Sequence, residues 1–435
     1  MRTAPHAQTS RTITGVLSDG ATWMAEVPIK WNGKALLYAH GYDSSQRALE
    51  SAPAVVRAEL LKKGYALVAS AYPRLGWVVA EAVPSQLLAL DAFAMRVGPP
   101  VSTIAWGVGM GGLITTALAE LHPERIHGAI ALCAASAGAI PMMNMALDGA
   151  FALTKLLLPA SVTVPITHVQ RGDVTVAIAI VGMIKDLAQS TTAGRARLAL
   201  AGVLGGVPGW TDPDCPRPST TDYWAQQEQL ARVMPAAVFL PRDDLEARAG
   251  GAGSGNVGVD YRKLLVQSRR QEMVEHLYRD ANIDLQQDLD RLNDAPRMGV
   301  DPAAVTYLQS HFTPSGRIGV PVLTLHTIGD GGISPLLQRS YVDTVKNAGK
   351  SELIAEGWVE RAGHCNMTCS EILAALRALE SRLVTGVWHV APAALNEGST
   401  PDDSKFVEFS ASPLPRGTEP RQKGDRPHLT MQRAQ

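Results

Sequence analysis

The chain has 435 residues, of which 46% are hydrophobic and 19% are charged, a balance typical of a globular protein with a large core. Its 40 basic and 41 acidic residues leave a net charge of −1, which argues against nucleic acid or an anionic membrane as a partner. The first twelve residues contain no apolar run, so we expect no secretory signal. Four cysteines without a CxxC pair fit a protein of the reducing cytoplasm.

Two apolar segments resemble membrane spans at first sight. Residues 128–147 carry no charge, but Pro141 and Asn144 interrupt them, and residues 174–184 cover only 11 positions. A spanning helix needs about 20 predominantly apolar residues. We therefore expect both segments in the protein interior.

The first third of the chain alternates strand and helix signals. Two short strands at 12–17 and 22–27 come first, followed by a buried strand at 34–39 (KALLYA) and a helix at 47–64. A strand at 66–71, a helix at 83–97, a strand at 102–106, a helix at 110–122 and a strand at 128–133 complete the pattern. This alternation predicts an α/β fold with a mostly parallel, doubly wound sheet.

The alternation stops after this segment and resumes near the C-terminus. Residues 138–315 carry mainly helical signals, and then a strand at 321–326 (PVLTLH), a helix at 336–348, a strand at 353–360 and a helix at 366–383 follow. We therefore divide the chain into a first core part (1–137), an inserted helical cap (138–315), a second core part (316–395) and a tail (396–435). Proline and charged residues dominate the tail, which predicts disorder.

A glycine-rich turn follows the strand at 102–106. The sequence Gly107-Val-Gly109-Met-Gly-Gly112 fits GxGxxG, the dinucleotide fingerprint. It also fits the G-x-S-x-G nucleophile elbow, with Gly109 in the serine position. The dinucleotide motif needs a carboxylate about 20 residues on, at the end of the next strand, but Cys133 and two alanines stand there. The elbow is therefore the better interpretation.

Three other segments lie where an elbow needs partners. The loop 38–42 (YAHGY) ends a predicted strand and is similar to the loop that donates an oxyanion-hole N–H in α/β-hydrolases. Asp330 and His364 follow the strands at 321–326 and 353–360, in the order elbow, acid, histidine. Over residues 31–137 and 316–390 the chain resembles the α/β-hydrolase superfamily, in particular capped esterases and acyl hydrolases.

The resemblance assigns Asp330 and His364 as an acid–histidine pair, and it places the oxyanion hole at the N–H of Met110 with that of Gly41 or Tyr42. Gly109 keeps a turn with positive φ but has no nucleophilic atom. We expect an enzyme that acts on an apolar carbonyl or ester-type small molecule by non-covalent acid–base catalysis, as a lyase, cyclase or hydrolase. Two alternatives stay open: a serine esterase or acyl hydrolase inactivated by an engineered Ser→Gly change, and a pseudoenzyme that binds a ligand.

The expected substrate site lies between the sheet and the cap. Tyr72, Arg74 and Trp77 follow a core strand, and Met142 and Met143 begin the cap. Met145, Phe151 and Leu153 are further candidates for an apolar wall, with cap core as the competing interpretation. No motif asks for a metal or another cofactor, and the sequence leaves a homodimer open.

Overall fold

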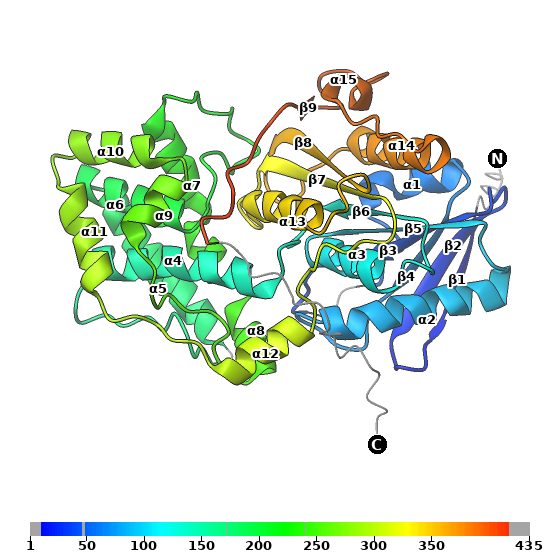
Figure 1. Cartoon of the computed structure of the whole chain (residues 1–435), viewed down its shortest axis with the longest axis horizontal. Helices are drawn as coiled ribbons and strands as arrows, with labels where there is room; N and C mark the ends of the chain where they lie inside the picture. The colour runs from blue at the N-terminus through cyan, green and yellow to red at the C-terminus, as the bar shows by residue number, and fades with distance from the viewer. Residues whose placement is uncertain (1–9, 46–47, 171, 240, 417–435) are drawn as a thin grey trace, which may run out of the picture.

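The computed structural model describes residues 10–45, 48–170, 172–239 and 241–416 (Figure 1). Nine strands form one sheet in the order β1-β2-β4-β3-β5-β6-β7-β8-β9. Their bounds are β1 Ser10–Val16, β2 Thr22–Pro28, β3 Lys34–Ala39, β4 Ala66–Ser70, β5 Ser102–Val108, β6 Gly128–Leu132, β7 Val322–Gly329, β8 Ile354–Ala362 and β9 Phe406–Val407. The pairings from β4 through β3, β5, β6 and β7 to β8 are parallel. The other three, β1 with β2, β2 with β4 and β8 with β9, are antiparallel.

This strand order, with a parallel centre and helices on both faces, is the α/β-hydrolase fold that the sequence predicted. Helices α1 (Ala54–Lys62) and α14 (Cys369–Thr385) cover one face of the sheet, and α2 (Val79–Val97), α3 (Met110–Leu121) and α13 (Leu336–Asn347) cover the other. The continuous apolar run that predicted the strand 34–39 is β3 with the same bounds, buried except at its first residue. The two short strands predicted at 12–17 and 22–27 are β1 and β2, which pair antiparallel.

The chain order reverses at the centre of the sheet. β3 pairs with β4 on one side and with β5 on the other, so the loops after β3 and β5 leave the same edge side by side. In open α/β sheets, ligands bind in the crevice outside the carboxyl ends of the strands at such a switch point. The fold therefore places the loop 38–42 beside the glycine turn that follows β5.

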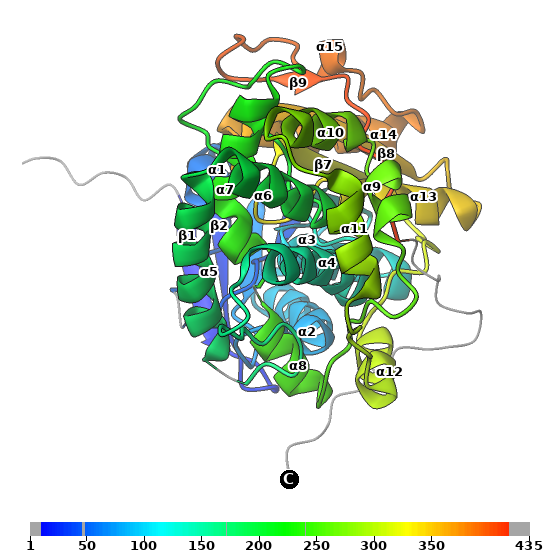
Figure 2. The same ribbon diagram turned by 90° about the vertical axis from the view of Figure 1, so that its left-hand side faces the viewer.

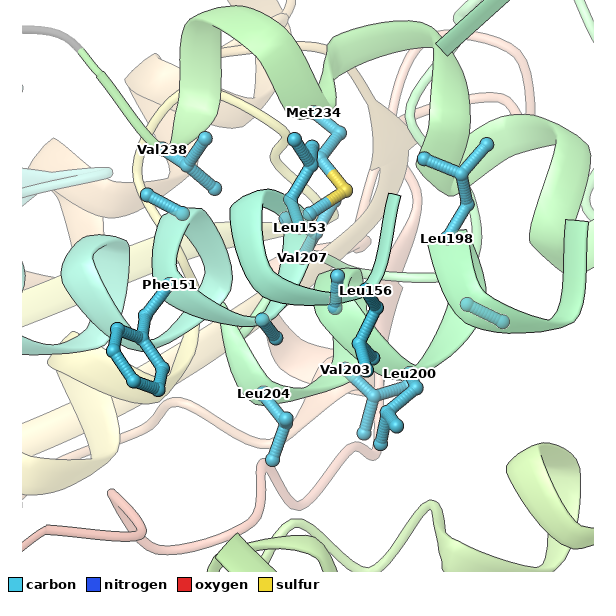
Figure 3. Packing of buried hydrophobic residues seen from close by; sticks show 14 of the residues in the cluster. Phe151, Leu153, Leu156, Leu198, Leu200, Val203, Leu204, Val207, Met234 and Val238 are labelled. Carbon is cyan, nitrogen blue, oxygen red and sulfur yellow. The ribbon is translucent and has the colours of Figure 1, made fainter. Parts of the chain in front are cut away.

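The inserted segment between β6 and β7 forms a helical cap at one side of the sheet (Figures 1 and 2). Its buried apolar residues make a cluster of their own, packed mainly between α4, α6 and α7 (Figure 3). The cap helices are α4 Ala139–Leu157, α5 Asp173–Gln189, α6 Thr192–Leu204, α7 Tyr223–Ala237, α8 Arg242–Ala249, α9 Tyr261–Gln267, α10 Gln271–Asp280, α11 Leu285–Asp294 and α12 Pro302–Ser310. None of the helices within the described ranges is both long and apolar enough to cross a membrane.

The structure corrects the prediction for the tail. Residues 396–416 pack against the rest of the molecule. Strand β9 pairs with β8, and Arg416 forms an ion pair with Asp148 of α4 at 2.8 Å. A few apolar residues among the prolines and charged residues anchor this segment. Phe406 and Ala411 are buried, and Phe409 packs on Trp358. The chain after β9 thus returns between core and cap (Figure 1). The predicted disorder of residues 417–435 lies outside the described residues.

Two predicted helix starts are also wrong. The first helix begins at Ala54 and not near residue 47, because Pro53 favours a helix start after it and an extended residue before it. Residues 46–47 themselves lie outside the described part. The second helix begins at Val79, so Pro84 lies within its second turn and does not mark its start.

Candidate active site

A cavity of about 1050 Å³ lies between the carboxyl ends of the strands and the cap. Its lining comes from the loops after β3, β4, β5, β7 and β8 and from the first turns of α4. Gly109, Asp330 and His364 all reach this cavity. The structure therefore brings together the three positions that the sequence placed far apart in the chain.

The turn at Gly109 connects β5 to α3 within one residue. Gly109 has φ +60° and ψ −119°, a conformation that costs a residue with a side chain on the order of 1–3 kcal/mol. Its N–H donates to the carbonyl of Leu132 at 3.0 Å, which fastens the turn to the end of β6. A side chain at Gly111 would overlap the carbonyl of Ala39, so the turn can approach β3 only as glycine. The glycines therefore serve backbone geometry in this turn.

His364 faces the turn from the loop after β8. A Cβ built on Gly109 would lie 3.2 Å from His364 Nε2 and 3.5 Å from Ile333 Cδ1. The loop is held in place because Gly363 N–H donates to Gly329 O and Thr327 Oγ1 donates to Gly363 O, both at 3.0 Å. The imidazole thus points its free nitrogen at the position where a side chain of residue 109 would begin.

Asp330 orients the imidazole from behind. Its Oδ2 lies 2.8 Å from His364 Nδ1, and its Oδ1 accepts the N–H groups of Gly332 and Ile333 at 2.8 and 2.9 Å. His326 Nε2 lies 3.3 Å from the same Oδ2. The carboxylate is fully buried, whereas the His364 side chain is 41% exposed toward the cavity. These contacts use both oxygens of Asp330 and fix the ring orientation of His364.

The buried carboxylate sets the charge state of the pair. Burial alone would lower the pKa of His364, but the attraction of Asp330 outweighs it and raises that pKa to about 9. Burial would likewise raise the pKa of Asp330, and the two neighbouring histidines outweigh this effect and hold it well below its ordinary value. At neutral pH the arrangement therefore favours an imidazolium paired with a carboxylate.

The predicted oxyanion-hole residues surround the turn. Met110 is the first residue of α3, so its N–H has no acceptor within the helix and lies at the positive end of the helix dipole. Gly41 packs against the end of β5, because a Cβ there would lie 3.1 Å from the carbonyl oxygen of Val108. Gly41, Tyr42 and Met110 all line the cavity. The backbone of this region can therefore present N–H donors to a developing negative charge.

The predicted substrate-binding residues occupy two walls of the cavity. Tyr72, Arg74 and Trp77 lie on the core side, and Met142, Met143 and Met145 lie on the cap side. Phe151 and Leu153, by contrast, belong to the buried interior of the cap (Figure 3). They are later on the same helix, and the Phe151 ring stacks on Tyr261 of α9 with 5.5 Å between ring centroids. The competing interpretation of cap core was therefore correct for them.

The sequence reasoning missed several contacts at this site. The His40 ring stacks on Tyr72 with 4.0 Å between ring centroids, and Tyr72 itself has φ +59°. Ile333 borders the space above Gly109, with its Cδ1 3.5 Å from the Cβ position of that residue. The YAHGY pattern at 38–42 predicted that the His40 loop lies at the site. No sequence pattern predicts the stacking of its ring or the position of Ile333.

A buried polar cluster lies behind the acid. Ligand atoms of Cys133, His326 and Asp330 lie within 4.8 Å of one another, and Nδ1 of His326 has no hydrogen-bond partner among the described residues. These atoms are of the types that bind zinc. Both Asp330 oxygens already accept hydrogen bonds, one from His364 and the other from two backbone N–H groups. The cluster therefore also holds the Asp330 carboxylate in position.

Comparisons with known proteins find similarity to hydrolytic enzymes. No protein-family model matches it. A curated protein named o-phthalyl amidase, from Xanthobacter agilis, is 29% identical over 443 residues, covering 94% of this chain and 92% of that protein. Solved structures with similarity include feruloyl esterase B from Aspergillus oryzae (15% identity, 87% of this chain and 82% of the other, TM-score 0.40) and an esterase from Pyrococcus furiosus (11%, 86% and 91%, TM-score 0.38). These TM-scores are low, so the fold assignment stands on the strand order.

Proposed function

We propose that this chain is an amide hydrolase that works without a nucleophile of its own at the turn. The observation that carries this proposal is the position of His364 Nε2, 3.2 Å from where the Cβ of a residue 109 side chain would lie. In α/β-hydrolases this position belongs to the nucleophile, and here it is Gly109. The acid–histidine pair and the backbone donors are present without it.

The substrate class that we propose follows from the relative and from the cavity walls. The similar protein is named for o-phthalyl amides, in which an aromatic ring carries the amide carbonyl. Tyr72, Trp77 and Met142 give this cavity aromatic and apolar contacts for such a ring. Arg74, which makes no hydrogen bond or ion pair with the described residues, is available at the cavity for an anionic group on the substrate.

In this proposal each group at the turn has one task. The Met110 N–H stabilises the negative charge that develops on the carbonyl oxygen. His364 moves protons to the leaving nitrogen and from water, while Asp330 holds its ring in one orientation. No acyl-enzyme forms at residue 109, because glycine offers no atom for one.

The alternatives make different predictions. If a serine at position 109 was replaced by engineering, the unaltered gene encodes serine there, and Gly109→Ser forms an acyl-enzyme with aryl esters. A ligand-binding pseudoenzyme binds carboxybenzanilides without turnover. A lyase or cyclase consumes its substrate without incorporating water. The named relative favours hydrolysis over these reactions.

Chromatographic assay of aniline released from 2-carboxybenzanilide tests the proposal. We expect turnover by the unmodified chain and a loss of about 10²- to 10⁴-fold in His364→Ala. His389→Ala is the matched control, because this exposed histidine lies outside the site. Absence of hydrolysis by the unmodified chain, or equal rates in His364→Ala, would rule out the proposed function.

A further inference from the structure

Gly109 supplies no nucleophilic side chain at the turn. Among the described residues that line the cavity, Ser334 and Cys365 carry a hydroxyl and a thiol close in sequence to Asp330 and His364, and further hydroxyls belong to Thr22, Tyr38, Tyr42 and Tyr72. The Ser334 hydroxyl is engaged as a donor to Gly206 O at 2.8 Å. Burial raises the pKa of the Cys365 thiol well above its ordinary value, and a thiol in that state attacks carbonyls poorly. Water and a group of the substrate are the nucleophiles that need no side chain at residue 109.

An amide of the o-phthalyl type brings a nucleophile with it. Its second carboxyl group sits on the neighbouring ring carbon, one bond rotation from the amide carbonyl, and attack closes a five-membered ring. Well-oriented intramolecular reactions of this kind reach effective molarities of about 10⁵–10⁸ M. The carboxylate is already ionised at neutral pH, so it needs no general base to activate it.

Such a reaction makes different demands on the enzyme from those of a serine mechanism. It needs an acid to protonate the leaving nitrogen, an N–H donor for the carbonyl oxygen, and room for the carboxylate. His364 is held as an imidazolium by the fully buried Asp330 carboxylate, as an acid requires. The absent Cβ of Gly109 leaves the space of one carbon atom 3.2 Å from His364 Nε2, at the wall of the cavity that both residues line.

We propose that the ortho carboxylate of the substrate occupies the space above Gly109 and attacks the adjacent amide carbonyl, in place of the absent enzyme nucleophile. This inference rests on the proposed amide hydrolysis and names its substrate class: aromatic amides with a carboxylate on the neighbouring ring carbon. The Gly109 position is then a substrate-binding feature as well as a tight turn.

The reaction balances in two steps. The carboxylate oxygen forms a C–O bond to the amide carbon, the carbonyl oxygen takes up the negative charge facing the Met110 N–H, and collapse breaks the C–N bond while the nitrogen takes the proton of His364. The products of this step are a cyclic anhydride and an amine. Water then adds to an anhydride carbonyl, His364 takes one of its protons, and cleavage of the anhydride C–O bond gives the monoanion of the diacid. This product loses its remaining proton to solvent and leaves as the dicarboxylate.

Isotope labelling tests this path directly. The substrate is 2-carboxybenzanilide with carbon-13 at the amide carbonyl, hydrolysed by the unmodified chain in oxygen-18 water with the enzyme-free reaction subtracted. Direct attack by water puts all oxygen-18 on the carbon-13 carboxyl, whereas an anhydride also puts it on the unlabelled carboxyl. We expect a substantial fraction on the unlabelled carboxyl, read from carbon-13 chemical shifts and total mass. Label confined to carbon-13 overturns the inference but leaves the proposed hydrolysis intact.

The position of the carboxylate gives a second test. The 3- and 4-carboxybenzanilide isomers keep the ring and the charge but cannot close the five-membered ring. We expect them to be hydrolysed about 10³-fold or more slowly than the 2-isomer, with a Cys365→Ser variant showing the same preference. Comparable kcat values for all three isomers would overturn the inference, since the carboxylate would then act only in binding.

Gly109→Ser separates the two nucleophiles in one protein. A serine there competes for the space beside His364, so we expect hydrolysis of the 2-isomer to fall at least about tenfold. Unchanged turnover of the 2-isomer in Gly109→Ser, with label still on the unlabelled carboxyl, would show that the carboxylate does not use this space and would overturn the inference. Failure of the unmodified chain to hydrolyse any isomer would instead count against the proposed function.

Discussion

The two walls of the cavity are built in different ways. On the core side, Gly109, Asp330 and His364 follow the carboxyl ends of the parallel strands β5, β7 and β8 and are held by hydrogen bonds of 2.8–3.0 Å. On the cap side, Met142, Met143 and Met145 present flexible apolar side chains from one helix. We infer a division between the two walls: the core wall holds the catalytic groups in place, and the cap wall adapts its side chains to the shape of the substrate. The predictions below test this division.

The largest effect is expected on the core wall, at Asp330. Asp330→Asn keeps the side-chain shape but removes the charge and lets His364 adopt the wrong tautomer, so we expect kcat to fall about 10³- to 10⁴-fold. Asp343→Asn, at a half-buried ion pair on α13 outside the cavity, is the matched control. Steady-state kinetics on 2-carboxybenzanilide measure both variants. If the kcat of Asp330→Asn stayed within threefold of the unmodified chain, the Asp330–His364 pair would have no part in the mechanism.

A methyl group on the turn should be the next largest change. In Gly109→Ala the new Cβ lies 3.2 Å from His364 Nε2, so we expect activity to fall about 100-fold or more, together with about 1–3 kcal/mol of stability lost to the positive φ. Gly258→Ala is a matched control, because Gly258 has φ +77° and open space around its Cβ position. We expect a similar stability loss there by urea unfolding, with full activity. Equal activity in both variants would show that the space above Gly109 is not used.

The pH profile tests which form of His364 is active. Its pKa is raised to about 9, so the imidazolium persists at neutral pH, and we expect kcat/KM to fall about tenfold per unit as pH rises beyond 9. The same shift contributes to folding stability fully below the ordinary histidine pKa, and this contribution is lost as pH rises through about 9. A kcat/KM that instead increases up to pH 10 would assign His364 the role of a base in the first step.

The smallest effect is expected on the cap wall. Met142→Ala removes apolar contact from the cavity, which we expect to cost on the order of 1 kcal/mol of substrate binding, or about fivefold in KM. The kcat should change less than threefold, since Met142 touches no group of the acid–histidine pair. A loss confined to kcat would contradict the division between the two walls.

Sequence alone predicted the core wall better than the cap wall. Buried parallel strands are continuous apolar runs, so β3 was located with its observed bounds, and β7 was found at 321–326 within one residue of its start. Parallel strands also fix which loops meet at one edge. The order of the turn, Asp330 and His364 along the chain was therefore enough to predict that they approach one another.

The remaining features depend on packing that leaves no local pattern. Phe151 and Met142 belong to one apolar helix, α4, yet one faces the cap interior and the other the cavity. His326 lies inside β7, and the turn at the end of that strand, in which Asp330 N–H donates to Thr327 O at 3.3 Å, brings its ring beside Asp330. In the tail, Phe406, Phe409 and Ala411 are apolar anchors within a polar segment, and the pairing of β9 with β8 overrides the composition.

The central claim is that the chemistry at Gly109 leaves no covalent bond between enzyme and substrate. Its most direct test is the intact mass of the chain, quenched by acid during steady-state hydrolysis of 2-carboxybenzanilide. We predict an unmodified protein at every time point while product accumulates. A phthaloyl adduct on the chain, formed and lost at the rate of turnover, would contradict the account.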